Sequence, residues 1–152
     1  MTAMTELPLL FTALAAYCDD EVLRRVAAAG HRGLRVSHGY VVQHVVPGPI
    51  TVTALAARLG MTPQGASKAV GELERLGYLR RRPGADRRER VVELTEAGLA
   101  VVEATRLARS EVTGELRRLA GPEARSMAAA LEALAVRTGA LDALMNRRLR
   151  PR

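Results

Sequence analysis

Arginines are concentrated on both sides of one Pro-Gly turn in the middle of the chain. The turn begins at Pro83, and residues 80–90 contain only two acids, Asp86 and Glu89. Like charges repel at this density, so the cluster either faces solvent or binds a polyanion such as nucleic acid. We favour the polyanion, because blocks of like charge that serve only solvation are typical of disordered segments. The six arginines are Arg80, Arg81, Arg82, Arg87, Arg88 and Arg90.

Residues able to do other chemistry are few and scattered. The histidines His31, His38 and His44 have no cysteine nearby that would complete a set of metal ligands, so no metal site is expected. Cys18 lies on the apolar face of a predicted helix, which favours a buried, inert thiol over a redox switch. No nucleophile–base pair and no paired carboxylates stand out. We therefore expect neither an enzyme nor a bound cofactor.

The whole chain carries a net charge of +7 over 152 residues, and its positive charge is unevenly distributed. Besides the cluster at 80–90, a second basic group lies within residues 146–152. A nearly neutral body with two basic segments is typical of a nucleic-acid-binding protein. The chain has one cysteine and no recognisable signal peptide or membrane span, so we expect a cytoplasmic protein. The second group is Arg147, Arg148, Arg150 and Arg152.

A helix-turn-helix pattern lies directly before the arginine cluster. Two short helices are predicted over 53–59 and 63–76, and Gly60 between them allows a left-handed turn. Thr62 is placed to cap the second helix, and Pro63 fits its first turn. The outer face of this helix then carries short polar groups and one lysine, which suits a DNA major groove. An ordinary helical hairpin is the alternative. The candidate reading residues are Thr62, Gln64, Gly65, Ser67 and Lys68.

Two short arms, 79–82 and 90–94, flank the Pro-Gly turn and form a predicted hairpin. A helix-turn-helix followed by an arginine-rich hairpin is a winged helix. Its wing would lie over the DNA backbone or minor groove, where phosphates neutralise the like charges and counterions are released. Asp86 precedes Arg88 by two residues, and we expect its carboxylate to hold the Arg88 guanidinium. The candidate wing residues are Arg82, Asp86, Arg87, Arg88 and Arg90.

Long helices are predicted on both sides of the winged segment. Helices over about 7–29 and 35–46 precede it, and Thr95 is predicted to cap a helix that runs to about residue 119. A last helix follows Gly121-Pro122, and its apolar residues alternate by four and three as in a coiled-coil seam. This seam packs either within the chain or against a second copy. Its members are Met127, Leu131, Leu134, Thr138, Leu141 and Met145.

These elements predict a mainly α protein with a winged helix-turn-helix and a small wing sheet of two to three strands. We expect residues 1–48 to form N-terminal helices that serve dimerisation and a hinge, residues 49–95 the DNA-binding region, and residues 96–152 the C-terminal dimerisation helices. The alternative from another class is a winged-helix module that binds protein instead of DNA. The wing arginines argue against it, because the core of a protein interface is depleted of charge.

The winged segment resembles the MarR family of bacterial winged-helix repressors over about residues 50–98. The wing signature of that family, Asp-x-Arg followed by Leu-Thr-x-x-Gly, is matched by Asp86 and Arg88 and then by residues 94–98. A preceding Leu-Glu-x-x-Gly is matched by residues 73–77. Gly65 and Gly71, and the small Ala66, depart from a regular, well-packed reading helix.

The resemblance implies a homodimer joined through its terminal helices and a palindromic operator in double-stranded DNA. It also implies Arg88 as the minor-groove residue, Asp86 as its brace and the helix at 63–76 as the reader. A small-molecule effector is a further possibility, bound between the dimerisation helices and the winged region. Arg32 and Arg35, among aliphatic residues, favour an anionic or apolar ligand.

Overall fold

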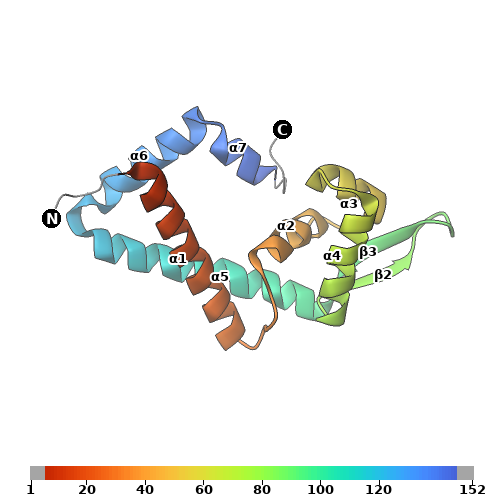
Figure 1. Cartoon of the computed structure of the whole chain (residues 1–152). Helices are drawn as coiled ribbons and strands as arrows, with labels where there is room; N and C mark the ends of the chain where they lie inside the picture. Colours follow the sequence, from red (N-terminus) through yellow and green to blue (C-terminus); the bar gives the residue numbers. More distant parts are fainter. Residues whose placement is uncertain (1–5, 147–152) are drawn as a thin grey trace.

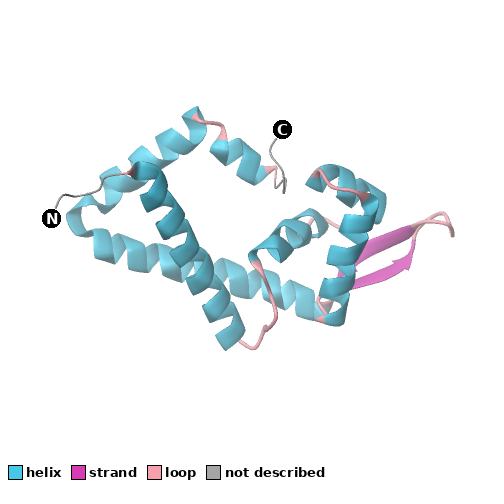
Figure 2. Cartoon of the chain, viewed as in Figure 1, coloured by secondary structure: helices cyan, strands magenta, loops and turns pink. Residues whose placement is uncertain are grey.

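The computed structural model describes residues 6–146, in which a long helical scaffold carries a small three-stranded sheet. The helices and the hairpin of this sheet are seen in Figures 1 and 2. Helices α1 and α5 cross near the middle of the molecule, and the hairpin β2–β3 projects from one end (Figure 1). In chain order the elements are α1 (Leu7–Ala28), α2 (Val36–Val45), β1 (Ile50–Thr51), α3 (Val52–Leu59), α4 (Pro63–Arg75), β2 (Leu79–Pro83), β3 (Arg90–Leu94), α5 (Glu96–Ala120), the 3-10 turn η1 (Gly121–Glu123), α6 (Ala124–Arg137) and α7 (Ala140–Met145).

The core lies inside the winged segment and is aliphatic. Leu55 and Leu59 of α3 are completely buried against Val70 and Leu73 of α4, and Val92 of β3 closes the cluster from the sheet side. Burial of branched aliphatic side chains is the main stabilising contribution in such a small domain. This core fixes the angle between α3 and α4 and the position of the hairpin beside them.

The sheet is antiparallel, with the strand order β1–β3–β2. In the register of the hairpin Leu79 lies opposite Leu94 and Pro83 opposite Arg90, so residues 84–89 form the tip. The first strand has only two residues, Ile50–Thr51, because Val52 already begins α3. Thr51 caps that helix by accepting a hydrogen bond from the Ala54 amide at 3.1 Å. The mainly α winged-helix fold is therefore confirmed.

The hairpin and α5 are joined by a tightly packed junction. As predicted, Thr95 caps α5: its hydroxyl accepts from the Gly98 amide at 3.0 Å and donates to the Gly77 carbonyl at 2.5 Å. A Cβ on Gly98 would lie only 2.1 Å from the carbonyl oxygen of Tyr78. The first turn of α5 therefore packs against the backbone before β2, and this contact holds the wing at a defined angle.

The expected single C-terminal helix is wrong: it breaks into α6 and α7. Gly139 adopts a left-handed conformation with φ of 74°, and its amide bonds to the carbonyl of Val136. Glycine ends helices in this way because it has no Cβ to clash. The apolar spacing continues through the break, so periodicity alone did not detect it, and the seam from Met127 to Met145 is carried by two helices.

Much apolar surface of the terminal helices is exposed in the single chain. In α1 the N-terminal residues Leu7, Phe11 and Leu14 are exposed, and Val26 is the buried residue of that helix. Polar contacts link the helix to α5, among them the Arg25–Glu115 ion pair at 2.6 Å. The seam of α6 and α7 is exposed as well, through Met127, Leu131, Leu134, Leu141 and Met145.

Candidate nucleic-acid interface

Helix α4 presents the expected polar face because its start is capped and its other face is buried. The Thr62 hydroxyl accepts a hydrogen bond from the Gly65 amide at 3.1 Å, and Pro63 occupies the first turn. The opposite face, which includes Ala66, packs into the core. Gln64 is consequently exposed at the N-terminal end of the helix.

The five predicted reading residues differ in how far they are available to a ligand. Gln64 and Lys68 are exposed, and neither makes a side-chain hydrogen bond or ion pair within residues 6–146. The Thr62 oxygen serves the helix cap, and the Ser67 hydroxyl accepts a hydrogen bond from Arg81 at 3.1 Å. A Cβ on Gly65 would lie 3.2 Å from the capping oxygen, so glycine there leaves room for the cap.

The strand arginines of the wing are tied to neighbouring acids. Arg80 and Arg82 each donate to one carboxylate oxygen of Glu93 at 2.8 Å. The hydrogen bond from Arg82, followed by that from Arg80, lowers the pKa of the Glu93 carboxyl below its usual value. Arg81, on the opposite face of β2, lies 2.9 Å from Glu74 and so links the hairpin to α4. Arg82, one of the predicted wing contacts, therefore shares one carboxylate with Arg80, which offsets part of its charge within the protein.

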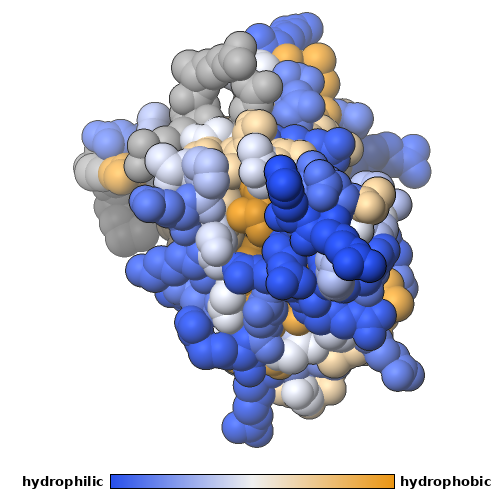
Figure 3. Space-filling view, turned by 90° about the vertical axis from the view of Figure 1, so that its right-hand side faces the viewer, coloured by the Kyte–Doolittle hydropathy of each residue, from blue (hydrophilic) through white to orange (hydrophobic). Residues whose placement is uncertain are grey.

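The tip of the wing and the first residue of β3 carry the arginines without such partners. Arg87, Arg88 and Arg90 are exposed and make no side-chain ion pair within the described chain. The face of the molecule that carries the wing is predominantly hydrophilic (Figure 3). These three cations lie at the end of a projecting hairpin, in a turn that also carries Asp86 and Glu89, and their guanidinium groups have no ion-pair partner in the described chain that would compete with a ligand.

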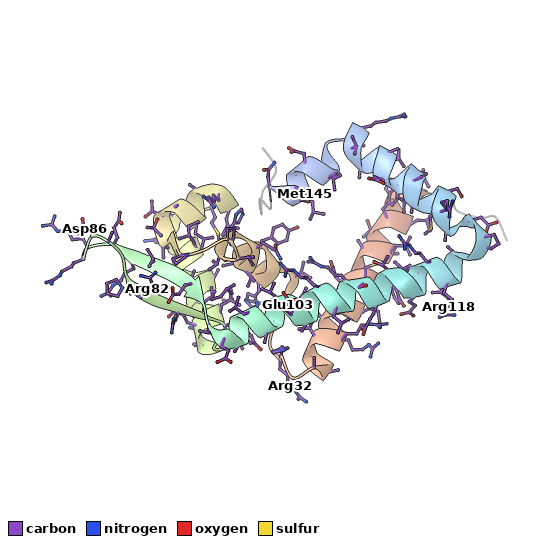
Figure 4. All side chains as sticks on the ribbon, turned by 180° about the vertical axis from the view of Figure 1, so that it is seen from behind. Arg32, Arg82, Asp86, Glu103, Arg118 and Met145 are labelled. Atoms are coloured by element: carbon purple, nitrogen blue, oxygen red, sulfur yellow. The ribbon has the colours of Figure 1, made fainter. Side chains whose placement is uncertain are left out.

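The predicted contact between the Asp86 carboxylate and the Arg88 guanidinium is wrong, because the carboxylate binds the backbone of Arg88 instead. One Asp86 carboxylate oxygen accepts from the backbone amide of Arg88 at 3.0 Å. The turn is closed by two backbone bonds, from Glu89 to Asp86 and from Gly84 to Glu89. An aspartate commonly binds the amide two residues ahead in a tight turn, because that amide is within reach without bending the side chain. Asp86, at the tip in Figure 4, thus shapes the loop that carries Arg88.

The remaining predictions concern the basic C-terminal group, a metal site, a membrane span and Cys18. The basic group from Arg147 to Arg152 lies outside the described residues. In the described part, no three His, Cys, Asp or Glu side chains gather as metal ligands, and no helix is long and apolar enough to cross a membrane. Cys18 is only half-buried; burial, and then the charge of Asp19, raise the pKa of its thiol.

A pocket of about 360 Å³ lies between α1, α2 and α5, and neither residue spacing nor composition located it. Its walls are mostly aliphatic, with Val22, Val26, Val42 and Val102 among them, and its polar groups include Arg35 and Arg109. Arg32, which was expected near a ligand, does not line it. It lies on the loop after α1, where its carbonyl accepts a hydrogen bond from Tyr78 (Figure 4).

Comparison with known sequences finds a protein family that is similar to the winged segment. The sequence model of the MarR family matches residues 32–89. Over these residues the chain is similar to the MarR family. The family is one of transcription regulators, and the match covers α2, the helix-turn-helix and the wing to its tip. No curated protein sequence matches the chain.

Solved structures extend the likeness over most of the chain. The YusO protein of Bacillus subtilis has a TM-score of 0.70 at 20% identity, with 88% of this chain and 94% of that chain covered. RV1404 of Mycobacterium tuberculosis has a TM-score of 0.68 at 22% identity, with 89% and 96% covered. A mutant of MepR from S. aureus, bound to an oligodeoxyribonucleotide, has a TM-score of 0.63 at 18% identity, with 87% and 96% covered. At these identities the likeness is one of fold, the MarR winged helix with its long flanking helices.

Proposed function

We propose that this protein is a dimeric, sequence-specific DNA-binding transcription regulator, and that it acts as a repressor released by a small-molecule effector. The observation that carries the proposal is the pairing of two exposed elements. Helix α4 offers Gln64 and Lys68 at its outer face, and the wing beside it offers Arg87, Arg88 and Arg90, which make no ion pair within the described chain. Together they suit a major groove and the adjoining phosphate backbone or minor groove.

The two elements would contribute to binding in different ways. Wing arginines bind phosphates or the minor groove of any sequence, and they gain from counterion release. Gln64 can form two hydrogen bonds to one adenine edge, which discriminates between bases by roughly 1–3 kcal/mol. Thr62, Gly65 and Ser67 complete the proposed reading face, with their polar groups partly used inside the protein. Among the wing residues, Asp86 shapes the tip, and Arg82 would contribute less to DNA binding because it is already bound to Glu93.

The exposed apolar face of the terminal helices supports a dimer. A chain that leaves Leu14, Leu134 and Leu141 in water gains stability if a second copy covers them. A two-fold dimer would place two copies of α4 on successive major grooves, roughly 34–36 Å apart, and would read a palindrome. Bound across a promoter, it would repress by excluding polymerase. The pocket between α1, α2 and α5 is the proposed effector site.

The decisive experiment is a salt titration of DNA affinity. The probes are a duplex from the region upstream of the chain's own gene and a scrambled duplex of equal length. For Arg88→Ala, we expect weaker binding to both duplexes and a salt slope shallower by up to about 0.9 per protomer for each phosphate that the wing no longer binds. For Gln64→Ala, we expect an unchanged slope and a loss of about 1–3 kcal/mol at one base position. An unaltered slope and scrambled-duplex affinity in Arg88→Ala would favour the protein-interaction alternative.

A further inference from the structure

Arg81 connects the hairpin to α4, the proposed reading helix, which lies beside it (Figure 1). Its Nη2 donates to the Ser67 carbonyl at 2.9 Å and to the Ser67 hydroxyl at 3.1 Å, and its Nε lies 2.9 Å from a carboxylate oxygen of Glu74. Since 3.6 residues make one turn, Ser67 and Glu74 lie on the same flank of α4, about two turns apart. The planar guanidinium has several N–H groups in fixed directions, so it can hold both residues at once.

Glu74 keeps Arg81 in this position. The carboxylate oxygen that faces Arg81 is shut off from water, and the side chains of Arg81 and Glu74 are 32% and 31% exposed. A carboxylate oxygen without access to water depends on its cationic partner, because removal of that partner leaves a charge that nothing compensates. Arg81 therefore stays with α4, in contrast to Arg87 and Arg88 at the tip, which make no ion pair within the described chain.

The Ser67 hydroxyl differs from the threonine hydroxyls inside the helices of this protein. Thr12, Thr105 and Thr113 each donate to the carbonyl four residues earlier, at 2.9, 2.8 and 2.8 Å. Such a bond is common for a hydroxyl inside a helix. Ser67 makes no bond of this kind: its oxygen accepts from Arg81, and its proton is donated to no group within residues 6–146. Arg81 thus occupies the hydroxyl as an acceptor and leaves its donor free.

This free donor lies at the edge of the exposed face of α4. Gln64 and Lys68, its neighbours on the helix surface, are exposed, and Ser67 itself is half-buried on the side of the hairpin. Gly71, one turn further on, has no side chain that could cover the hydroxyl. In the major groove, both purines present N7 as an acceptor, and its lone pair is not used in the Watson–Crick pair. A single free proton on the outer face of α4 suits this acceptor.

We propose that Arg81 fixes the Ser67 hydroxyl as a hydrogen-bond donor to a purine N7, so that the protein distinguishes purine from pyrimidine at one position of each half-site. This inference rests on the proposed function. A pyrimidine has no N7, so a donor held in this place loses its acceptor. Without Arg81, the Ser67 hydroxyl can turn to the carbonyl of Pro63, as the threonine hydroxyls turn to theirs, and the discrimination is lost. Ser67 then touches the base, and Arg81 is a positioning residue.

The test uses the full-length protein and 7-deazapurines, in which a C–H group replaces N7 and the base pair is kept. The operator is a duplex that the wild type selects from a random pool, and each purine of one half-site is replaced in turn. Affinity is measured by fluorescence anisotropy. In the wild type we expect a position at which the replacement weakens binding about 3- to 10-fold, the usual effect of one hydrogen bond between neutral groups. In Ser67→Ala and in Arg81→Met, the same replacement should change the affinity less than about twofold, because that hydrogen bond is already missing.

Glu74→Gln is the matched control, because it weakens the other contact of Arg81 and leaves the hydrogen bond to Ser67 in place. Its ratio of affinities for the normal and the substituted operator should equal that of the wild type. If Arg81 only fastens the hairpin, Arg81→Met weakens both duplexes equally and keeps the wild-type ratio, which would overturn the proposal. A ratio lost in Glu74→Gln as well would attribute the effect to a loosened hairpin, with the same consequence.

Ser67→Ala removes a single half-buried hydroxyl, so it keeps the test decisive even if Arg81→Met does not fold. A wild-type scan without a sensitive purine would overturn the proposal, and so would sensitive positions that all persist in Ser67→Ala. A random pool from which no sequence is enriched refutes the proposed function, and this inference with it. An enriched operator that shows no dependence on Ser67 refutes this inference alone.

Discussion

Single side chains decide how much of the wing's charge reaches a ligand. Glu93 neutralises part of the positive charge of Arg80 and Arg82, because each of its oxygens accepts from one of them at 2.8 Å. We expect Glu93→Gln to strengthen binding to specific and scrambled duplexes alike. The salt slope should steepen by up to about 0.9 for each arginine that reaches a phosphate. Salt titration of duplex affinity measures both effects.

Glu103→Gln is the control for this change of charge. Glu103 pairs with Arg106 on the exposed surface of α5, outside the wing (Figure 4). The same removal of one negative charge should leave the salt slope close to that of the wild type. If both variants steepen the salt slope equally, the change in net charge explains the effect. The ion pairs with Glu93 would then not keep Arg80 and Arg82 from binding phosphates.

Cys18 is the second residue whose chemistry is testable. The pKa of its thiol is raised by burial and by Asp19, so little thiolate is present at neutral pH. We expect Cys18→Ser to bind DNA as the wild type does, and peroxide to release neither protein. Duplex affinity before and after peroxide treatment measures this. Release of the wild type alone would identify Cys18 as a redox switch.

Among the elements, the junction of β3 and α5 determines how the wing is held. A methyl group at Gly98 would overlap the Tyr78 carbonyl, which belongs to rigid backbone. Gly98→Ala should lower the free energy of unfolding by about 3 kcal/mol, at the upper end of overpacking effects. Urea unfolding followed by circular dichroism measures this decrease.

Gly114 offers the comparison within the same helix. A Cβ there has no atom within 4 Å, so Gly114→Ala should stabilise α5 by up to about 1 kcal/mol through helix propensity alone. Similar changes in the two variants would show that helix propensity, and not the contact with Tyr78, accounts for the effect at Gly98.

At the scale of the whole molecule, the exposed terminal helices predict assembly. We expect a dimer in solution, and we expect deletion of residues 122–152 to give a monomer or an aggregate with little affinity for the duplex. Light scattering measures the mass, and a full-length monomer at micromolar concentration contradicts the proposal. Leu134→Glu is a milder variant: Leu134 is already 46% exposed in the single chain, so the fold should persist while the dimer weakens.

Leu99→Glu is the corresponding control, since Leu99 is also exposed but lies in the first turn of α5, beside the hairpin. It should leave the mass in solution unchanged. Dissociation of the dimer in both variants would place the interface elsewhere, or would show that any added charge on an exposed apolar site disrupts assembly.

The sequence by itself determined the local structure of this protein. The capping roles of Thr62 and Thr95, the left-handed Gly60 and the hairpin around Pro83 follow from interactions within a few residues, and all were predicted. The apolar spacing of α3 and α4 likewise specified which faces form the core. These features are legible because cap, turn and amphipathic signals depend on neighbours close along the chain.

Only the tertiary structure decided which polar groups meet over long separations. The strand register places Arg80 opposite Glu93, with Arg82 on the same face. It thereby separates the arginines that bind this acid from those that have no ion-pair partner in the described chain. Alternation along β2 puts these two arginines on one face of the strand. Which acidic residue lies next to them is known only from the register of the hairpin. The contact between Arg35 and Glu72 joins residues 37 positions apart, and the pocket is formed by three helices distant in sequence. Such contacts depend on the packing of whole elements, which no short stretch of sequence encodes.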